Sequence, residues 1–307
     1  MAKRVLVTGA YGFIGRHTAK EFHRAGYYVI GLGHGIWGLD EASEWGVDEW
    51  HVGDVTMDAL QTYALDCEVI VHCAGSGSVG FSIANPMKDF ERTVWTTHYV
   101  LEFIRLYSPH TRFIYPSSAA VYGNQEKLPL SVSMSLNPIS PYGVHKKIVE
   151  ELCQMYAKQY DVSIAVLRLF SVYGNGLRKQ LLWDACRKLT ENENEFWGTG
   201  EETRDWVHVY DVACSMLKAV DYASADCPVV NVAGGHGVKI SDILKLVFKA
   251  FGDNGQPYFC GQVNVGNPNH YVGDISEIKE WGWCSQMALE EGISDYVRWF
   301  MEYEGKR

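Results

Sequence analysis

Short and nearly continuous hydrophobic runs recur along the chain, separated by longer helix-like stretches. The runs are rich in β-branched residues, which is typical of parallel strands buried on both faces of a sheet. Seven strands are predicted, over residues 5–9, 28–33, 50–54, 69–75, 112–118, 163–170 and 229–235. Because strands and helices alternate, we predict a doubly wound α/β domain with a parallel sheet and right-handed crossovers.

Two helices have clear starting signals. They are predicted over residues 86–107 and 141–160, and each follows an N-cap residue, Asn85 or Ser140, and starts with a proline. A proline is favoured at the first helical position because it has no N–H group that would lack a partner there.

The regular alternation loosens beyond about residue 175. We therefore predict a large domain over residues 1–174, to which residues 205–235 return. A smaller, interleaved C-terminal region over residues 175–307 is expected to close over the carboxyl edge of the sheet.

Composition and charge narrow the classes of function. The chain has 307 residues, of which 47% are hydrophobic and 21% charged, as in an ordinary soluble globular protein. A formal charge of -10 argues against nucleic acid as a partner. The sequence contains no run of 18 apolar residues, so no membrane span is predicted. The eight cysteines lack CxxC spacing and several, such as Cys73, lie in apolar runs, so we expect reduced thiols, no metal site and a cytoplasmic protein.

A glycine-rich loop follows the first predicted strand. Gly9, Gly12 and Gly15 occur in VLVTGAYGFIG, directly before a helix-like stretch. Glycines at such a turn let the backbone approach a pyrophosphate, which then lies at the positive N-terminus of the helix. The pattern, placed between a strand and a helix, predicts a dinucleotide-binding Rossmann domain over residues 1–174, with the smaller region binding the substrate.

The second predicted strand ends without the usual acid. Gly33 and His34 occupy the place where a carboxylate normally holds the adenosine ribose hydroxyls. A 2′-phosphate would then meet no repulsion, and His34 could lie beside it, although His34 is equally compatible with a polar loop residue. The cofactor is therefore NAD or NADP, and the sequence leaves the choice open.

Tyr142 and Lys146 are four residues apart in SPYGVHKK, so they share one face of the predicted helix. An ammonium beside a phenol favours the phenolate and is expected to lower the pKa of Tyr142, and a cationic nicotinamide ring would add to the effect. Tyr142 could then exchange a proton with a sugar or alcohol hydroxyl while a hydride passes to the cofactor.

Six motifs together resemble the extended short-chain dehydrogenase/reductase family, in its nucleotide-sugar epimerase/dehydratase branch. They are TGAYGFIG, VHCAG, YPSSAAVYGN, SPYGVHKK, RLFSVYGNG and GTGEETRDWVHVYDVA, and they span nearly the whole chain. The resemblance implies that Tyr142 is the catalytic base, that Lys146 orients the nicotinamide ribose and that Ser118 hydrogen-bonds the reacting oxygen. It also implies a cofactor site made of Gly9, Gly12, Phe13, Ile14, Gly15, Gly33, His34, Asp54, Val55, Ala74, Gly75, Ser76, Tyr142 and Lys146.

The resemblance further implies a nucleotide-diphosphate sugar as substrate. The residues expected to bind it are Ser78, Ser118, Ser171, Arg178, Arg204 and His270. Arg204 matches the pyrophosphate-binding arginine of the family, whose guanidinium forks well onto phosphate. The second arginine of many members is missing, since Val265 or its neighbours stand in its place, and Arg178 with Lys179 could compensate. Ser171 and Thr93 stand where relatives often have asparagine.

The reaction is narrowed by the residues after Ser118. Dehydratases of the family usually carry Thr-Asp-Glu where this chain has Ser118-Ala119-Ala120, and two alanines cannot supply the acid and base that loss of water needs. We expect a nucleotide-sugar 4-epimerase that oxidises C4 transiently. An NADPH-dependent 4-keto reductase is the alternative, because Gly33 suits NADPH. A 4,6-dehydratase and a non-catalytic dinucleotide-binding regulator are less favoured.

Relatives commonly dimerise through two helices that correspond to residues 86–107 and 141–160, so the resemblance also implies a homodimer. The sugar and the nucleotide base are not fixed by the sequence.

Overall fold

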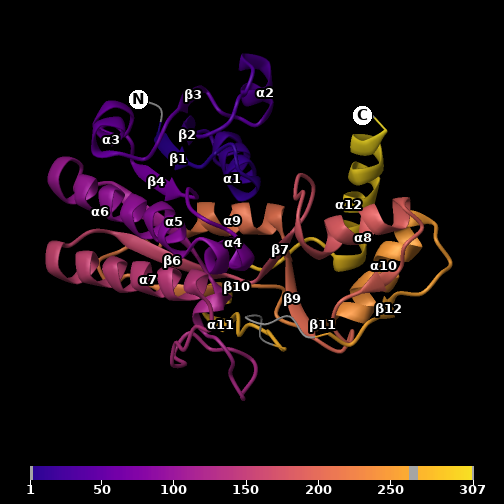
Figure 1. Cartoon of the computed structure of the whole chain (residues 1–307). Coiled ribbons are helices and arrows are strands. Elements are labelled where there is room, and N and C mark those ends of the chain that lie inside the picture. The colour runs from indigo at the N-terminus through magenta and orange to yellow at the C-terminus, as the bar shows by residue number, and fades with distance from the viewer. Residues whose placement is uncertain (1–2, 263–268, 306–307) are drawn as a thin grey trace.

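The computed structural model describes residues 3–262 and 269–305. Its centre is a parallel seven-stranded sheet with the order β10-β6-β5-β4-β1-β2-β3 (Figure 1). The strands are β1 (Arg4–Thr8), β2 (Tyr28–Gly33), β3 (Glu49–Val52), β4 (Val69–His72), β5 (Arg112–Ser118), β6 (Ile164–Leu169) and β10 (Val229–Val232). All seven predicted strands are confirmed. Several end a few residues earlier than predicted, because the last residues of those hydrophobic runs already turn into the loops above the sheet.

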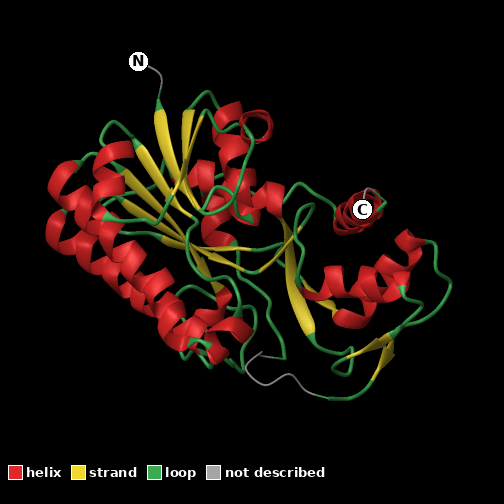
Figure 2. Ribbon diagram, turned by 45° about the horizontal axis from the view of Figure 1, so that its top comes forward, coloured by secondary structure: helices red, strands yellow, loops and turns green. Residues whose placement is uncertain are grey.

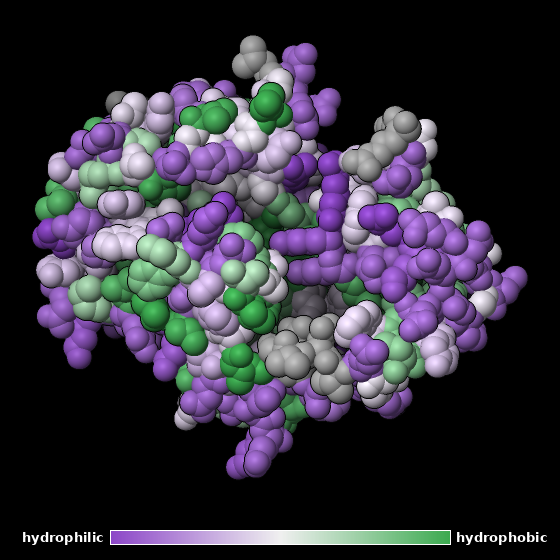
Figure 3. Space-filling model, in the orientation of Figure 1, coloured by the Kyte–Doolittle hydropathy of each residue, from purple (hydrophilic) through white to green (hydrophobic). Residues whose placement is uncertain are grey.

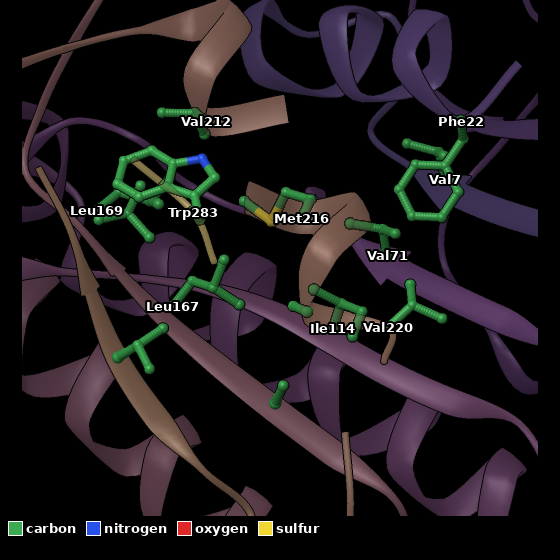
Figure 4. Close-up of a cluster of buried hydrophobic side chains, with 14 of the residues drawn as sticks. Val7, Phe22, Val71, Ile114, Leu167, Leu169, Val212, Met216, Val220 and Trp283 are labelled. Atoms are coloured by element: carbon green, nitrogen blue, oxygen red, sulfur yellow. The ribbon is translucent and has the colours of Figure 1, made fainter. Parts of the chain in front are cut away.

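Helices cover both faces of this sheet, as the doubly wound prediction requires. One face carries α1 (Phe13–Arg24) and α9 (Val209–Ala219), and the other carries α3 (Met57–Tyr63), α6 (Thr96–Tyr107) and α7 (Pro141–Tyr160). Alternate residues of a strand serve the two faces. Val5 and Val7 of β1 belong to the hydrophobic core under α1 and α9, whereas Leu6 belongs to the other core. Figure 4 shows Val7 and Phe22 in the first of these cores.

The two predicted helices are confirmed in position, with one difference. Residues 86–107 form α5 (Pro86–Phe90), a π-helical stretch (Glu91–Trp95) and α6, rather than one uniform α-helix. π-Helical turns are rare, and they often occur beside functional sites. The start of α7 follows the prediction, because the Ser140 hydroxyl accepts a hydrogen bond from the amide of Gly143 at 3.2 Å.

A smaller part of the molecule lies beside the sheet (Figure 2). It contains a three-stranded sheet of β7 (Ser171–Tyr173), β9 (Thr203–His208) and β11 (Gly237–Lys239), and a pair of β8 (Glu195–Phe196) and β12 (Tyr258–Phe259). It also contains α8 (Gln180–Thr190), α10 (Ile240–Phe251) and α12 (Leu289–Glu304), which share a third hydrophobic core.

The chain crosses between the two parts more than once. After β9 in the smaller sheet it returns to the central sheet through α9 and β10, and then leaves again for α10. The remaining helices are α2 (Leu39–Glu44), α4 (Val79–Ala84) and α11 (Ser276–Glu280), and a short 3-10 helix covers Ala119–Val121. None of the helices in the described residues combines the length and the apolar character needed to cross a membrane.

The sheet order also determines where a ligand can bind. Strands β1 and β4 are neighbours in the sheet, and the chain leaves them toward opposite edges. In open α/β sheets the crevice at the carboxyl ends of such strands is the usual ligand site.

Candidate active site

A cavity of about 920 Å³ lies at the carboxyl ends of the central strands, against the smaller part of the molecule. Its walls come from the glycine loop after β1, the loops after β4 and β5, the start of α7, and segments around β7, α8, β8 and β9. Figure 3 shows the surface hollowed between the two parts. Its volume lies near the upper end of the range found for small-molecule and cofactor sites.

The glycine loop packs too tightly for side chains at two of its three glycines. A Cβ on Gly9, where φ is +68°, would lie 2.7 Å from the amide nitrogen of Ala74. A Cβ on Gly15 would approach the carbonyl oxygen of Gly9 even more closely. Gly12 is the N-cap of α1 and lines the cavity, and a Cβ there would meet only one neighbour, the carbonyl oxygen of Gly9 at 3.0 Å.

The start of α1 is suited to hold an anion. No side chain caps it, and its first turn contains no acidic residue. The amides of this turn therefore point their partial positive charge toward the cavity, as in known pyrophosphate sites. The first-strand side of the cavity fits a dinucleotide. The lining residues predicted to contact it are Gly9, Gly12, Phe13, Ile14, Gly15, Ala74, Gly75, Ser76, Tyr142 and Lys146.

The π-helical stretch supports this wall of the cavity from behind. The hydroxyl of Thr93 accepts a hydrogen bond from the amide of Ser76 at 3.4 Å, and Gly75 takes a φ of +136° beside it. Thr93 thus supports the loop that follows β4, although relatives often have asparagine at this position.

Four predicted cofactor residues lie at the ends of β2 and β3, outside the lining of the cavity. His34 Nε2 and Asp54 Oδ1 are 2.8 Å apart, and both side chains are more than two-thirds exposed. Val55 is buried in the core under α6. A Cβ on Gly33 would lie 3.3 Å from the Cα of Gly9, so β2 packs closely against the glycine loop at the position where an acid is usual.

The three predicted catalytic residues all line the cavity. Ser118 ends β5, and its hydroxyl accepts a hydrogen bond from the amide of Ala120 at 3.2 Å. Tyr142 lies in the first turn of α7, where its amide donates to the hydroxyl of Ser82 at 3.0 Å. Lys146 donates from Nζ to the carbonyl oxygen of Pro116 at 2.9 Å, and Nζ lies 5.9 Å from the ring centre of Tyr142.

The predicted lowering of the pKa of Tyr142 is wrong for the protein chain by itself. Burial raises the pKa of Tyr142 above 10.0, and a hydrogen bond with Ser118 only partly opposes this. Burial also lowers the pKa of Lys146 from 10.5 to about 8. Taking both groups out of water thus opposes the charged form of each, and the effect outweighs their proximity.

A buried network of charged and polar groups lies behind these residues, and the sequence analysis did not find it. Arg168 of β6 and Glu150 of α7 form an ion pair at 2.7 Å, and the hydroxyl of Ser117 donates to Glu150 at 2.5 Å. Arg168 also donates to the hydroxyl of Tyr122, which donates to Asn231 of β10 at 2.7 Å. The network therefore ties β5, β6, β10 and α7 together. No motif announces it, because its members are far apart in sequence.

On the substrate side, Ser78, Ser171 and Arg204 line the cavity. Arg204 Nη1 donates to the carbonyl oxygens of Thr203 at 2.8 Å and Asn269 at 3.1 Å. The aromatic ring of Tyr271, another lining residue, lies 5.8 Å from the guanidinium. Arg204 is therefore held in place while facing the cavity.

Two other predicted substrate residues are not part of the cavity lining. The guanidinium of Arg178 lies 4.1 Å from the ring centre of Tyr303, and His270 is exposed and bonds Thr203 at 3.0 Å. Val265, which stands in place of the second arginine, lies outside the described residues.

Among the described residues, Lys179 is the third lysine or arginine in the cavity lining, beside Lys146 and Arg204. Its Nζ donates at 3.0 Å to the carbonyl oxygen of Gly77, which lies in the loop after β4. Burial lowers the pKa of Lys179. From the sequence, Lys179 was expected only to assist Arg178. Trp197, a largely exposed aromatic side chain in the lining, was not predicted. The only signal was a tryptophan in the EFWGTG stretch before Arg204. Within residues 3–262 and 269–305, no three His, Cys, Asp or Glu residues are grouped so as to hold a metal ion.

The fold and the cavity together define an NAD-dependent enzyme of the Rossmann class, with a tyrosine and a lysine at the reacting end. The family model of the NAD dependent epimerase/dehydratase family matches residues 5–233, and the chain belongs to this family. This confirms the resemblance drawn from the motifs.

The similar proteins share the full length of the chain. A putative UDP-glucose 4-epimerase of Methanocaldococcus jannaschii is 29% identical over 96% of this chain and 97% of its own length. The UDP-glucose 4-epimerase of Bacillus subtilis is 28% identical over 96% of each chain. The crystal structure of a UDP-glucose 4-epimerase of Thermotoga maritima with UDP-glucose superimposes with a TM-score of 0.88, at 25% identity over 98% of this chain and 99% of its own.

Proposed function

We propose that the protein is a nucleotide-diphosphate-sugar 4-epimerase, which oxidises C4 of the sugar transiently and reduces it again with a tightly bound nicotinamide cofactor. The observation that carries the proposal is the meeting of Ser118, Tyr142 and Lys146 in one cavity, next to Ala119 and Ala120. Relatives named as 4-epimerases, one of them solved with UDP-glucose, cover nearly the whole chain and support a UDP-sugar as substrate.

The chemistry at C4 needs a proton acceptor and a hydride acceptor. A nicotinamide cofactor held at the glycine loop and beside Lys146 would supply a hydride acceptor for C4, which would give the hydride back on the opposite face of the turned keto sugar. Tyr142 takes the proton from the hydroxyl at C4 and gives it back, and Ser118 holds the same oxygen by a hydrogen bond. Burial raises the pKa of Tyr142 in the chain alone, and the positive charge of a bound nicotinamide ring would lower it again.

The residues of this cavity fit the alternative reactions less well than they fit a 4-epimerase. A dehydratase needs an acid and a base beside Ser118, where two alanines line the cavity. A 4-keto reductase would use NADPH, and Gly33 favours that cofactor because it leaves no acid at the end of β2. Asp54 argues against it, because its carboxylate lies beside His34, where the extra phosphate would bind. A regulator without turnover would have no need of the buried tyrosine–lysine pair.

The diphosphate of the substrate is proposed to bind Arg204 and Lys179. Both are cations in the cavity lining, and each is held by backbone carbonyl oxygens that a phosphate oxygen could replace as a partner. Trp197 offers an aromatic face on which a nucleobase could stack. Ser78 and Ser171 would then face the sugar, and Arg178 and His270 would serve only at the rim.

We also propose how the chain divides these tasks. Residues 1–174, with residues 205–235 returning to them, bind the cofactor, and the rest of residues 175–307 binds the nucleotide part of the substrate. The eight free thiols suit a cytoplasmic location.

A homodimer through residues 86–107 and 141–160 is proposed as the assembly. It is supported by apolar side chains exposed on these helices, and Figure 3 shows such side chains over α4, α5 and α7. They are Met87, Trp95, Tyr99, Leu106, Tyr107, Val144, Met155 and Tyr160. Exposed apolar surface of this kind is typical of interfaces.

The test is turnover by the purified protein on a panel of UDP-, GDP-, CDP- and dTDP-sugars, with the products identified by NMR and NADPH followed by absorbance. We expect conversion to the C4 epimer without net use of cofactor. Use of one NADPH per product would mean the reductase, and a 4-keto-6-deoxy product would mean the dehydratase. No turnover on any sugar would favour the regulator.

A further inference from the structure

A buried acid–imidazole pair lies behind the reacting residues. Asp89 of α5 is fully buried, and its Oδ2 lies 2.5 Å from Nδ1 of His145 on α7, which is also buried. The ring of Phe90 packs edge-on against the imidazole at 5.3 Å. The other carboxylate oxygen, Oδ1 of Asp89, is buried and has no hydrogen-bond partner among the described residues.

This pair is directly connected to the proposed catalytic residues. His145 immediately precedes Lys146 in α7 and lies one helical turn after Tyr142, and α5 and the π-helical stretch pack against the same helix. The structure therefore places the carboxylate of Asp89 against the turn of α7 that carries both groups, among buried side chains. In such surroundings a charge acts more strongly than it does on the surface.

The electrostatic environment agrees with this geometry. Burial has the largest effect on both groups, but the charge of Asp89 raises the pKa of Tyr142 and also raises that of Lys146. The other groups that face Lys146 are His72 and Cys73 at the end of β4, Tyr115 of β5 with its ring centre 4.6 Å from Nζ, and Glu150 and Cys153 on α7 itself, and Ser118 of β5 faces Tyr142.

Asp89 differs from Glu150 in what balances its charge. Glu150 is paired with the permanent charge of Arg168 at 2.7 Å. Asp89 is paired only with an imidazole, which carries a charge only when it is protonated. The carboxylate of Glu150 therefore has a permanent positive charge beside it, whereas the partner of Asp89 in its pair is an imidazole.

We propose that Asp89 and His145 are positioning residues that set the charge felt by Tyr142 and Lys146: the carboxylate of Asp89 favours the ammonium of Lys146 and the neutral phenol of Tyr142, and His145 holds that carboxylate in place. The proposal rests on the proposed function only where it refers to Tyr142 as the base. Its effect on Lys146 is a property of the folded chain and can be measured without any turnover.

The experiment follows the titration of Lys146 by NMR in protein labelled with ¹³C at the lysine Cε, with the signal assigned by its loss in Lys146→Met. We expect Asp89→Asn, which keeps the shape of the side chain and removes its charge, to move the midpoint of Lys146 to lower pH. His145→Gln keeps the carboxylate and should not lower the midpoint. Glu151→Gln is the matched control, because it removes an exposed acid from the same helix and should leave the midpoint unchanged.

Two results would overturn the proposal. One is an unchanged midpoint in folded Asp89→Asn. The other is an equal fall in His145→Gln, which would mean that any disturbance of the packing has the same effect. If Asp89→Asn does not fold, the double variant Asp89→Asn/His145→Gln replaces it, with two amides in place of the pair. Its Lys146 midpoint should also lie at lower pH than in the wild type, and an unchanged midpoint would overturn the proposal.

A second readout connects the pair to the reaction. The acid limb of the pH profile of kcat/KM should move to lower pH in Asp89→Asn, because the phenol of Tyr142 loses its proton more easily there. A purely structural role would lower the rate without moving the profile, and that outcome would contradict the proposal. If the wild type converts no nucleotide sugar, the proposed function fails, while the titration of Lys146 still decides on the pair.

Discussion

The reacting end of the cavity and the surface at the ends of β2 and β3 are built in opposite ways. At the reacting end, Lys146, Glu150 and Asp89 are buried, and each has a fixed partner within hydrogen-bond distance. At the other end a single pair, His34 and Asp54, stands on the surface with both side chains largely exposed.

This difference determines how much stability is lost when one partner of a pair is removed. Removing one partner of a buried ion pair leaves an uncompensated charge and costs about 3–5 kcal/mol. An exposed pair contributes about 0–1 kcal/mol, and salt screens it. We therefore expect substitutions at the reacting end to affect the stability of the fold, and substitutions of His34 and Asp54 to change the preference for NAD or NADP at little cost in stability.

The largest effect is expected from Tyr142→Phe, which removes the proton acceptor and keeps the ring. Turnover should fall by roughly 10²–10⁴-fold, while calorimetry should show nearly unchanged affinity for the cofactor. Tyr115→Phe is a matched control, because the hydroxyl of Tyr115 is buried and has no partner in the described part of the chain. Near-normal turnover in Tyr142→Phe would remove this residue from the mechanism and with it the special role of the buried end.

The cations on the substrate side should have an intermediate effect. Arg204→Gln and Lys179→Gln each remove a charged hydrogen bond to phosphate, which corresponds to about 10- to 100-fold in KM. Arg178→Gln, whose guanidinium stacks on Tyr303 away from the cavity, should change KM little. An equal rise of KM in all three variants would show that general charge, rather than the position of these two groups, attracts the substrate.

Burial of Lys146 should cost stability, and the cost should depend on pH. Its pKa falls from 10.5 to about 8 on folding, so below pH 8 the folded protein holds a buried charge that the unfolded chain exposes to water. The folded form binds fewer protons than the unfolded chain between these values, so stability rises with pH from about 8 to 10.5. Lys146→Met should lack this dependence.

We therefore expect Lys146→Met to abolish turnover and yet to raise the free energy of unfolding at pH 7 by about 2 kcal/mol. This figure combines a desolvation cost on the order of 3 kcal/mol with the loss of about 1 kcal/mol for the bond to Pro116. Thermal unfolding at pH 7 and pH 10 measures it, and the gain should shrink at the higher pH. A lower Tm for the variant at both pH values would contradict the stated cost of burial.

The smallest effect is expected at the exposed end. Asp54→Asn removes the carboxylate beside His34. This carboxylate is the acid close to the end of β2, where Gly33 itself has no acidic side chain. Two charges about 4 Å apart in water interact by about 1 kcal/mol, so affinity for NADP(H) relative to NAD(H) should rise roughly fivefold. The change should fade at high salt, and His34→Asn should shift the ratio the other way. A ratio that is the same in the wild type and Asp54→Asn would mean that this pair does not touch the choice of cofactor.

The sequence predicted the parts of the molecule that depend on local pattern. Buried strands, prolines at helix starts and the glycine loop each have a signature within a few residues, and the seven strands and both helices were found at the predicted places. Gly9 and Gly15 could be singled out because close backbone contacts admit no other residue there.

The parts that depend on distant contacts could not be predicted. The bond from Ser117 to Glu150 and the pairing of Asp89 with His145 join residues far apart in sequence. The rise in the pKa of Tyr142 was not predicted either, because burial is a property of the packed molecule. Arg178 was predicted in the cavity and Lys179 points there instead, since one residue along the chain changes the direction of a side chain.

The most direct measurement uses a UDP-sugar that carries deuterium at C4, converted by the cofactor-loaded protein in ordinary water without added NAD(P)H. The account predicts that the C4 epimer forms and keeps its deuterium at C4, because the hydride leaves and returns to the same carbon. In a matched reaction of the unlabelled sugar in deuterated water, no deuterium should enter C3, C5 or C6. Loss of the label from C4, deuterium at any of these three carbons, or a product formed only with stoichiometric NADPH would contradict the assignment as a 4-epimerase.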